Sequence, residues 1–176
     1  MWEDFAEYIY NYCNDIINKK NKIGAINKIN INEKLRDFNF EFNIQNANYN
    51  NLNNQKDKYS CKIVEIAIGK FFGVSNYIIK NFKSNNINFL ATDINPAKEN
   101  ILLDDIKNPN MDIYSDADLI YSIRPPQELQ PYIGNIVNNT SADLIIKPLF
   151  NEDLNLGLDM KLVNYKKAAF YQKKNI

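Results

Sequence analysis

The chain contains no histidine at all. This excludes His-containing catalytic triads and histidine metal sites, and it removes the commonest general base. The only two cysteines, Cys13 and Cys61, lie far apart within apolar patterns. We expect both to be buried reduced thiols rather than a disulfide or a nucleophile, and we expect no bound metal.

Long apolar runs and an excess of either charge are also absent. No stretch approaches the roughly 18 apolar residues that a membrane span needs, and the acidic start, residues 1–4, is unlike a basic secretory signal, so we expect a cytoplasmic protein without a membrane partner. Lys and Arg number 21, as do Asp and Glu. This balance argues against bulk electrostatic binding of nucleic acid. Apolar residues make up 45% of the 176, a composition typical of one globular domain.

The middle of the chain predicts a buried strand, a glycine turn and a helix. Residues 63–68 contain four β-branched side chains around Glu65, as in a strand buried on both faces. The pattern breaks at Gly69 and continues through Gly73 into a helical pattern over residues 74–82. Backbone N–H groups at such a helix start, beside the carboxyl end of a strand, suit a nucleotide-like ligand.

The rest of the chain alternates strands with helices. Further strands are predicted at residues 87–93, 101–103, 117–123 and 142–147, and a helix follows residues 124–126. Residues 158–165 and 167–172 read as an antiparallel hairpin. We therefore expect an α/β fold in three layers, Rossmann-like, with a mostly parallel sheet, a C-terminal antiparallel hairpin and few helices between the second and fourth strands.

Three regions are expected along the chain. Residues 1–20 form an amphipathic helix packed on the domain, and lysines near its predicted end suit the helix dipole. Residues 21–58 form an Asn-rich insertion, a loop or a hairpin, in which alternation at residues 26–31 and 38–44 predicts strands. Residues 59–176 form the Rossmann-like domain.

Gly69, Asp93 and Asp105 follow three successive predicted strands. In an open α/β sheet, ligands lie outside these carboxyl ends. An acid on the second strand, a little over twenty residues after the glycine turn, can accept hydrogen bonds from both ribose hydroxyls. Asp105 and the N–H of Ile106 can face an adenine edge. Each acid alone is more often a helix cap or a solvated loop residue, but together they predict a nucleoside site.

Two nucleotide classes are disfavoured by motif. The dinucleotide pattern G-x-G-x-x-G is replaced by Ala67, Gly69 and Phe72, and a phenylalanine at the third position would hold the helix away. No G-x-x-x-x-G-K-[ST] sequence occurs, which excludes a P-loop.

The string Val64–Gly69 resembles the first motif of Rossmann-like S-adenosylmethionine-dependent methyltransferases, an acid followed by glycines at alternate positions. Residues 92–94 and 104–106 are similar to their second and third motifs. The resemblance implies S-adenosylmethionine as cofactor, bound by Glu65, Ala67, Gly69, Asp93, Asp105 and Ile106.

A closer resemblance is to a small uncharacterised family of archaeal proteins with a reduced methyltransferase-like fold. Its strings stand here as residues 64–69, 91–94, 104–106, 117–130 and 147–149. Ala67 replaces a glycine of the family pattern, and its methyl group would crowd the cofactor's carboxypropyl end. The resemblance implies the fold rather than an activity, and no catalytic residue is assigned.

The string Tyr121–Pro126 is the least ordinary part of the predicted site. Amino-methyltransferases use an Asp or Asn, two prolines and an aromatic residue to hold the target nitrogen. Here Arg124 stands in place of the acceptor, and a guanidinium donates rather than accepts. It suits a carboxylate or phosphate, so Ser122, Arg124 and Pro125 are predicted to contact substrate or cofactor. The alternative is that Arg124 only pairs with Glu65 or Asp118.

Two functions remain open at this point. The first is a methyltransferase-like protein that binds S-adenosylmethionine, with unknown acceptor. The alternative is a non-catalytic nucleoside-binding or protein-interaction domain that meets a partner, or a second copy, through an uncovered sheet face. Five C-terminal lysines offer a basic face for RNA, but lysines also protect an edge hairpin.

Overall fold

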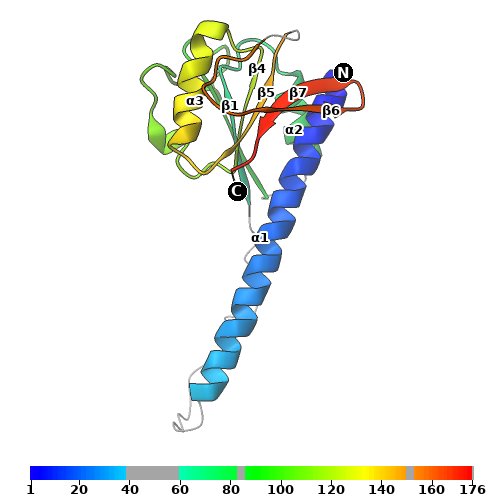
Figure 1. Cartoon of the computed structure of the whole chain (residues 1–176), viewed down its shortest axis with the longest axis vertical. Coiled ribbons are helices and arrows are strands. Elements are labelled where there is room, and N and C mark those ends of the chain that lie inside the picture. The colour runs from blue at the N-terminus through cyan, green and yellow to red at the C-terminus, as the bar shows by residue number, and fades with distance from the viewer. Residues whose placement is uncertain (39–59, 83–85, 150–152, 176) are drawn as a thin grey trace.

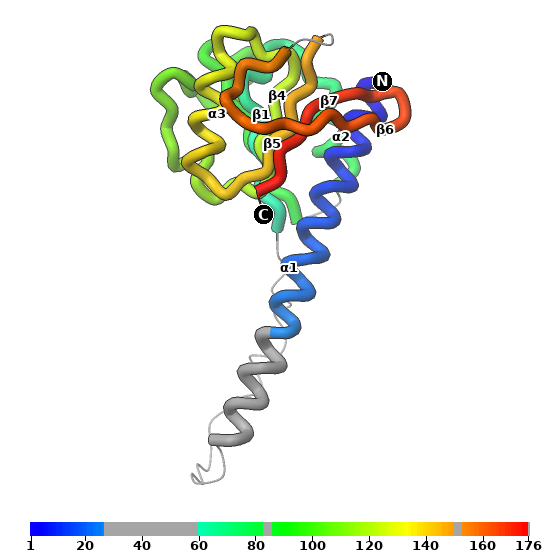
Figure 2. The backbone as a smooth tube through the Cα atoms, in the orientation of Figure 1, coloured from blue at the N-terminus to red at the C-terminus, as the bar shows by residue number. Residues whose placement is uncertain are grey.

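The computed structural model describes residues 1–38, 60–82, 86–149 and 153–175 (Figures 1 and 2). Within these residues the strands form one seven-stranded sheet in the order β3-β2-β1-β4-β5-β7-β6. The strands are β1 (Cys61–Ile66), β2 (Ile87–Asp93), β3 (Leu102–Leu103), β4 (Leu119–Ile123), β5 (Asp143–Lys147), β6 (Lys161–Tyr165) and β7 (Ala168–Lys173).

The predicted α/β fold is confirmed. Strands β1 to β5 pair in parallel, whereas β7 is antiparallel to both β5 and β6. The predicted C-terminal hairpin is therefore β6 and β7. Sequence order reverses where β1 lies beside β4, and such a reversal is where open α/β sheets bind their ligands.

Helices cover both faces of the sheet, which confirms the three layers (Figure 1). The helices α1 (Trp2–Phe38) and α2 (Gly73–Asn81) pack on one face, where Phe5 and Ile9 meet Tyr121 and Phe170. The helix α3 (Gln130–Asn138) packs on the other face with its buried side chains Ile133, Ile136 and Val137. Cys13 and Cys61 are both free and buried, as predicted.

The predicted end of the first helix is wrong. Helix α1 continues to Phe38 and leaves the domain, so residues 26–31 are helical rather than a strand (Figure 1). Residues 21–38 contain no proline and a single glycine, Gly24, and isoleucines at 23, 26 and 29 also recur at helical spacing. Residues 39–58, with the second alternating patch, lie outside the described residues.

The longer helix also changes the role of the lysines near residue 20. Lys20 does not stabilise a helix end. Its ammonium group pairs with the Asp118 carboxylate, 2.7 Å away, and donates to the carbonyl of Ser60. Despite the length of α1, none of the described helices combines the length and hydropathy that crossing a membrane requires.

The connection from β2 to β4 is short of helix, as predicted. Every residue from 94 to 118 is described, and this stretch contains only β3 and the 3₁₀ turn η2 (Met111–Ile113). A second 3₁₀ turn, η3 (Gln127–Leu129), leads into α3.

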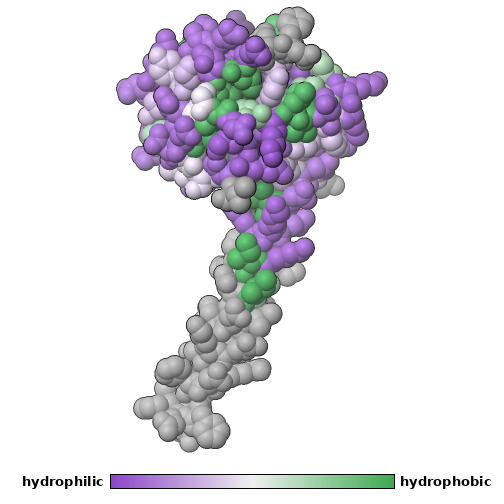
Figure 3. Space-filling model, in the orientation of Figure 1, coloured by the Kyte–Doolittle hydropathy of each residue, from purple (hydrophilic) through white to green (hydrophobic). Residues whose placement is uncertain are grey.

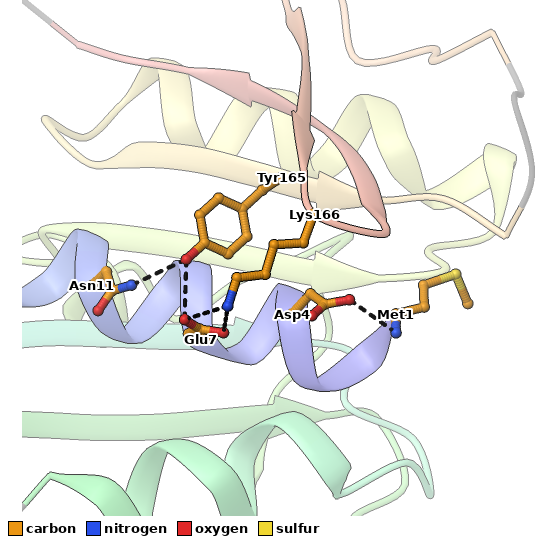
Figure 4. A network of polar contacts seen from close by, with 6 residues as sticks. All are labelled: Met1, Asp4, Glu7, Asn11, Tyr165 and Lys166. Carbon is orange, nitrogen blue, oxygen red and sulfur yellow. Dashed lines mark hydrogen bonds and ion pairs between the residues drawn. The ribbon is translucent and has the colours of Figure 1, made fainter.

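A polar network ties the start of α1 to the β6–β7 turn (Figure 4). The Glu7 carboxylate accepts hydrogen bonds from the Lys166 ammonium group at 2.6 Å and from the Tyr165 hydroxyl at 3.2 Å. The amino group of Met1 pairs with Asp4 at 3.1 Å. On the face shown in Figure 3, hydrophobic areas interrupt the polar surface of the domain; Leu149 and Leu162 are among the exposed apolar side chains.

Gly134 is required where α3 crosses the segment before β6. A methyl group at this position would lie 2.0 Å from the carbonyl oxygen of Leu156. We expect Gly134→Ala to destabilise the protein by about 1–3 kcal/mol, because the backbone must move apart. Denaturant unfolding measures this, with the exposed neighbour Asn135→Ala as control; equal stabilities of the two variants would contradict the close packing.

Candidate functional site

A pocket of about 400 Å³ opens at the carboxyl ends of four parallel strands. Ala67, the first residue after β1, lines this pocket. The other lining residues lie at or after the ends of β2, β3 and β4. Its walls are formed by Ala67, Asp93, Ile94, Asp104, Asp105, Ile106, Lys107, Pro126 and Leu129. The structure thus brings together four of the predicted cofactor-binding residues, Ala67, Asp93, Asp105 and Ile106, beside the β1–β4 switch point.

Asp93 connects this pocket to the glycine turn. Its Oδ2 accepts the N–H of Gly69 at 2.8 Å, and its Oδ1 accepts the N–H of Asn95 at 2.8 Å. Each carboxylate oxygen can accept a second hydrogen bond. Asp93 therefore fixes the turn and still has acceptor capacity for a ligand.

The two adjacent acids after β3 have different surroundings. Asp104 is buried and accepts hydrogen bonds from the N–H of Asn110, at 2.9 Å, and from the Tyr114 hydroxyl. Burial, and next the Asp104 carboxylate, raise the pKa of Tyr114 above its ordinary value. Asp105 is partly exposed, and its Oδ1 accepts the N–H of Lys107 at 3.0 Å.

Both acids border the pocket, but the Asp104 carboxylate is held by Asn110 and Tyr114, whereas Asp105 is partly exposed there. Tyr114, on which the Asp104 contact depends, also contacts the Thr92 hydroxyl at 3.2 Å. Sequence reasoning missed Tyr114, because a lone tyrosine ten residues beyond an acid gives no local signal.

Ala67 occupies a backbone conformation that favours glycine. Its φ is +54°, and Gly69, two residues on, has φ +59°. A left-handed conformation costs a residue with a Cβ roughly 1–2 kcal/mol. Ala67 thus holds a conformation that a glycine, the residue of the family pattern, would adopt without this cost, and it adds a methyl group at the pocket wall.

We expect Ala67→Gly to raise the free energy of unfolding by up to about 1 kcal/mol, because relief of the strained φ outweighs glycine's extra chain entropy. Gly69→Ala is the matched opposite change: nothing lies within 4 Å of the added methyl group, so strain alone should lower stability. Thermal unfolding of both variants checks the pair. If the unfolding temperatures of the two variants shift in the same direction, a left-handed conformation at both positions is contradicted.

Glu65 lies beneath the site and does not line the pocket. It is fully buried on β1, and its Oε2 accepts the Tyr121 hydroxyl at 2.7 Å. Its Oε1 has no hydrogen-bond partner among the described residues. Burial raises the pKa of this carboxyl to about 8, although the Tyr121 hydrogen bond opposes the shift.

The predicted site residues at the end of β4 and after it have two kinds of surroundings: some make contacts within the fold, and Arg124 borders a second hollow. The Ser122 hydroxyl donates to the carbonyl of Ile66 at 2.9 Å and ties β4 to the end of β1. Pro125 is buried, and its carbonyl accepts from Gln130 at 3.3 Å. Arg124 is exposed and borders a hollow of about 520 Å³, which shares Pro126 with the first pocket.

The alternative pairing of Arg124 is wrong. Asp118 pairs with Lys20, and Glu65 binds the Tyr121 hydroxyl. The Arg124 guanidinium carbon instead lies 4.7 Å from the centre of the Trp2 ring. Within the described ranges, no three Cys, Asp or Glu side chains converge as metal ligands would.

Comparison with known proteins gives the family. The model of an uncharacterised protein family, UPF0146, matches residues 44–175, well over half of the chain. The chain therefore belongs to the UPF0146 family. The match starts after the described part of α1, so Trp2 lies outside the UPF0146 region.

UPF0146 relatives come from several archaea, which confirms the resemblance seen in the sequence. The UPF0146 protein of Methanothermobacter thermautotrophicus is 44% identical over 111 residues, covering 63% of this chain and 81% of the relative. That of Methanocaldococcus jannaschii is also 44% identical, over 122 residues, covering 66% and 87%.

The chain is also similar to a solved fibrillarin structure. Fibrillarin from Aeropyrum pernix, crystallised with natively bound S-adenosyl-L-methionine, aligns with a TM-score of 0.46 at 12% identity, over 65% of this chain and 66% of that chain. This similarity is too low to indicate what a UPF0146 protein binds.

Proposed function

We propose that this protein binds S-adenosylmethionine in the pocket at the ends of β1 to β4 and is methyltransferase-like. The observation that supports the proposal is the joining of Asp93 and Asp105, from two strand ends, in one pocket with Ile106 and Leu129 as apolar walls. Its volume, about 400 Å³, lies in the range of small-molecule sites.

Each part of the cofactor has a complementary group in this proposal. The remaining acceptor positions of the Asp93 carboxylate accept hydrogen bonds from the ribose hydroxyls. The ribose is then bound next to the turn that Asp93 already holds through the N–H of Gly69. Asp105 and the N–H of Ile106 meet the adenine edge, between apolar side chains. The turn from Ala67 to Gly69 receives the methionine part.

A bound S-adenosylmethionine would supply an activated methyl group. The chain's own contribution is then to bind and align the two reactants, which needs no histidine. Arg124, at the adjoining hollow, is proposed to hold a reactant.

Thermal unfolding with S-adenosylmethionine and S-adenosylhomocysteine tests the binding. Ligand at about 100 times its dissociation constant should add roughly 2.7 kcal/mol of stability. Ala67→Gly removes a methyl group from the pocket and should increase the shift. No shift at millimolar ligand contradicts the proposal.

The second candidate is a binding domain without turnover. In its favour, Glu65, whose pKa burial raises to about 8, does not line the pocket, so this carboxyl group is not placed to take a proton from an acceptor bound there. Transfer of labelled methyl groups to a cell extract distinguishes the candidates. Cofactor binding without any transfer favours the second.

A further inference from the structure

We propose that Arg124 and Lys147 form a binding site for the anionic group, a carboxylate or a phosphate, of one of the two reactants. The identity of the reactants rests on the proposed function, whereas the site itself rests on the contacts around Trp2.

Two cations meet at one aromatic ring. The Arg124 guanidinium carbon lies 4.7 Å, and the Lys147 ammonium nitrogen 5.5 Å, from the centre of the Trp2 ring. The backbone sets this pair, because Arg124 follows β4, Lys147 ends β5, and the Arg124 N–H donates to the Lys147 carbonyl at 2.8 Å. Trp2 in turn packs on Phe71, just after the glycine turn, with ring centres 4.8 Å apart.

Neither cation is neutralised within the described part of the chain. Lys147 is only 6% exposed, and among the described residues its ammonium group donates only to the Pro148 carbonyl, at 3.4 Å. Lys20, Lys62 and Lys166 each form an ion pair with a carboxylate, but no such pair with another described residue involves Lys147 or Arg124.

Such a pair of cations is costly without an anion. Burial, and next the charge of Arg124, lower the pKa of Lys147. The Trp2 ring attracts both cations but cancels neither charge. Glu128 borders the hollow beside Arg124 without an ion pair to it. A bound anion would satisfy both groups, since a guanidinium fork and an ammonium group together suit carboxylate or phosphate oxygens.

The position of the pair suits a reactant next to the adenosyl pocket. The hollow beside Arg124 shares Pro126 with that pocket. It also shares Leu149 with a smaller hollow of about 280 Å³, which Lys147 and Lys167 border. The anion site therefore adjoins the pocket on the β5 side of the sheet.

Trp2 makes the site directly observable, because it is the only tryptophan of the chain. We expect inorganic phosphate to change Trp2 fluorescence saturably, beyond the effect of sodium chloride at equal ionic strength. Lys147→Met, which keeps the length and removes the charge, should weaken the apparent phosphate affinity about tenfold or more. The matched control is Lys161→Met, at an exposed lysine of β6. Arg124→Gln, at an exposed side chain, replaces Lys147→Met if the latter does not fold.

The source of the anion is settled by two adenosyl ligands. S-adenosylhomocysteine has a carboxylate, whereas 5′-methylthioadenosine lacks it. If the donor supplies the anion, Lys147→Met weakens binding of the first ligand only, and that ligand blocks the phosphate response. If the acceptor supplies it, both ligands bind the variant normally, and phosphate still changes Trp2 fluorescence when the adenosyl pocket is saturated.

A phosphate response without any adenosyl binding would overturn the proposed function and leave the anion site standing. The anion site itself is overturned if phosphate acts no differently from chloride and Lys147→Met changes no ligand affinity. It is also overturned if Lys147→Met and Lys161→Met respond to phosphate alike.

Discussion

Replacing Glu65 with glutamine should abolish a pH dependence of stability that the wild-type protein shows between about pH 5 and pH 8. In the folded protein burial raises the pKa of Glu65 to about 8, whereas in the unfolded chain this carboxyl ionises near its ordinary pKa of 4.5. The unfolded state therefore loses its proton first as the pH rises. Wild-type stability should be highest below the unfolded pKa and fall through this window, by about 1.4 kcal/mol per pH unit.

Glu65→Gln keeps the shape and the acceptor for Tyr121 but carries no ionisable group, so its stability should stay nearly flat. No histidine contributes to the pH dependence of stability between about pH 5 and pH 8, because the chain has none. Lys147 has a lowered pKa, but its effect has the opposite sign, since stability rises as it deprotonates at higher pH. Denaturant unfolding of both proteins at several pH values measures the difference; parallel curves would contradict a buried protonated Glu65.

Replacing Asp93 with asparagine should abolish the stabilisation by S-adenosylhomocysteine. The amide keeps only one acceptor oxygen and no charge, so it cannot accept hydrogen bonds from both ribose hydroxyls while it also holds the turn. It also loses one of the hydrogen bonds from the N–H groups of Gly69 and Asn95, which should lower stability by about 1 kcal/mol. For this reason asparagine is a better test than alanine, which would remove both bonds.

The matched control for Asp93 is Asp112→Asn, at an exposed acid of η2. It should leave both the stability and the ligand shift unchanged. Thermal unfolding of both variants with and without ligand gives the comparison. A full ligand shift in Asp93→Asn would refute the role of Asp93 at the ribose.

Local sequence signals predicted most of the sheet and its carboxyl-end acids. The apolar runs predicted the positions of the strands to within a few residues, and β2 has the predicted bounds. Asp93, Asp105 and Ile106 were predicted from strand ends, and Ala67 from the resemblance of its string to the first methyltransferase motif. All four line one pocket, because parallel strands end at the same edge of the sheet.

Long-range contacts could not be predicted in the same way. The alternation at residues 26–31 suits both a strand and a helix, and the helix continues because nothing in residues 21–38 stops it. The alternative pairing of Arg124 with Asp118 or Glu65 was wrong, since Asp118 pairs with Lys20 and Glu65 binds the Tyr121 hydroxyl. The contact of Trp2 with Arg124 and Lys147 joins three distant segments and leaves no local pattern.

The central claim is that the pocket at the ends of β1 to β4 holds an adenosyl ligand. The most direct measurement is a titration of the ¹⁵N-labelled protein with S-adenosylhomocysteine, followed by amide resonances. We predict saturable shifts confined mainly to residues 67–69, 93–95 and 105–107, on three separate loops of one pocket. No change at millimolar ligand, or changes centred on another part of the molecule such as β6 and β7, would contradict the account.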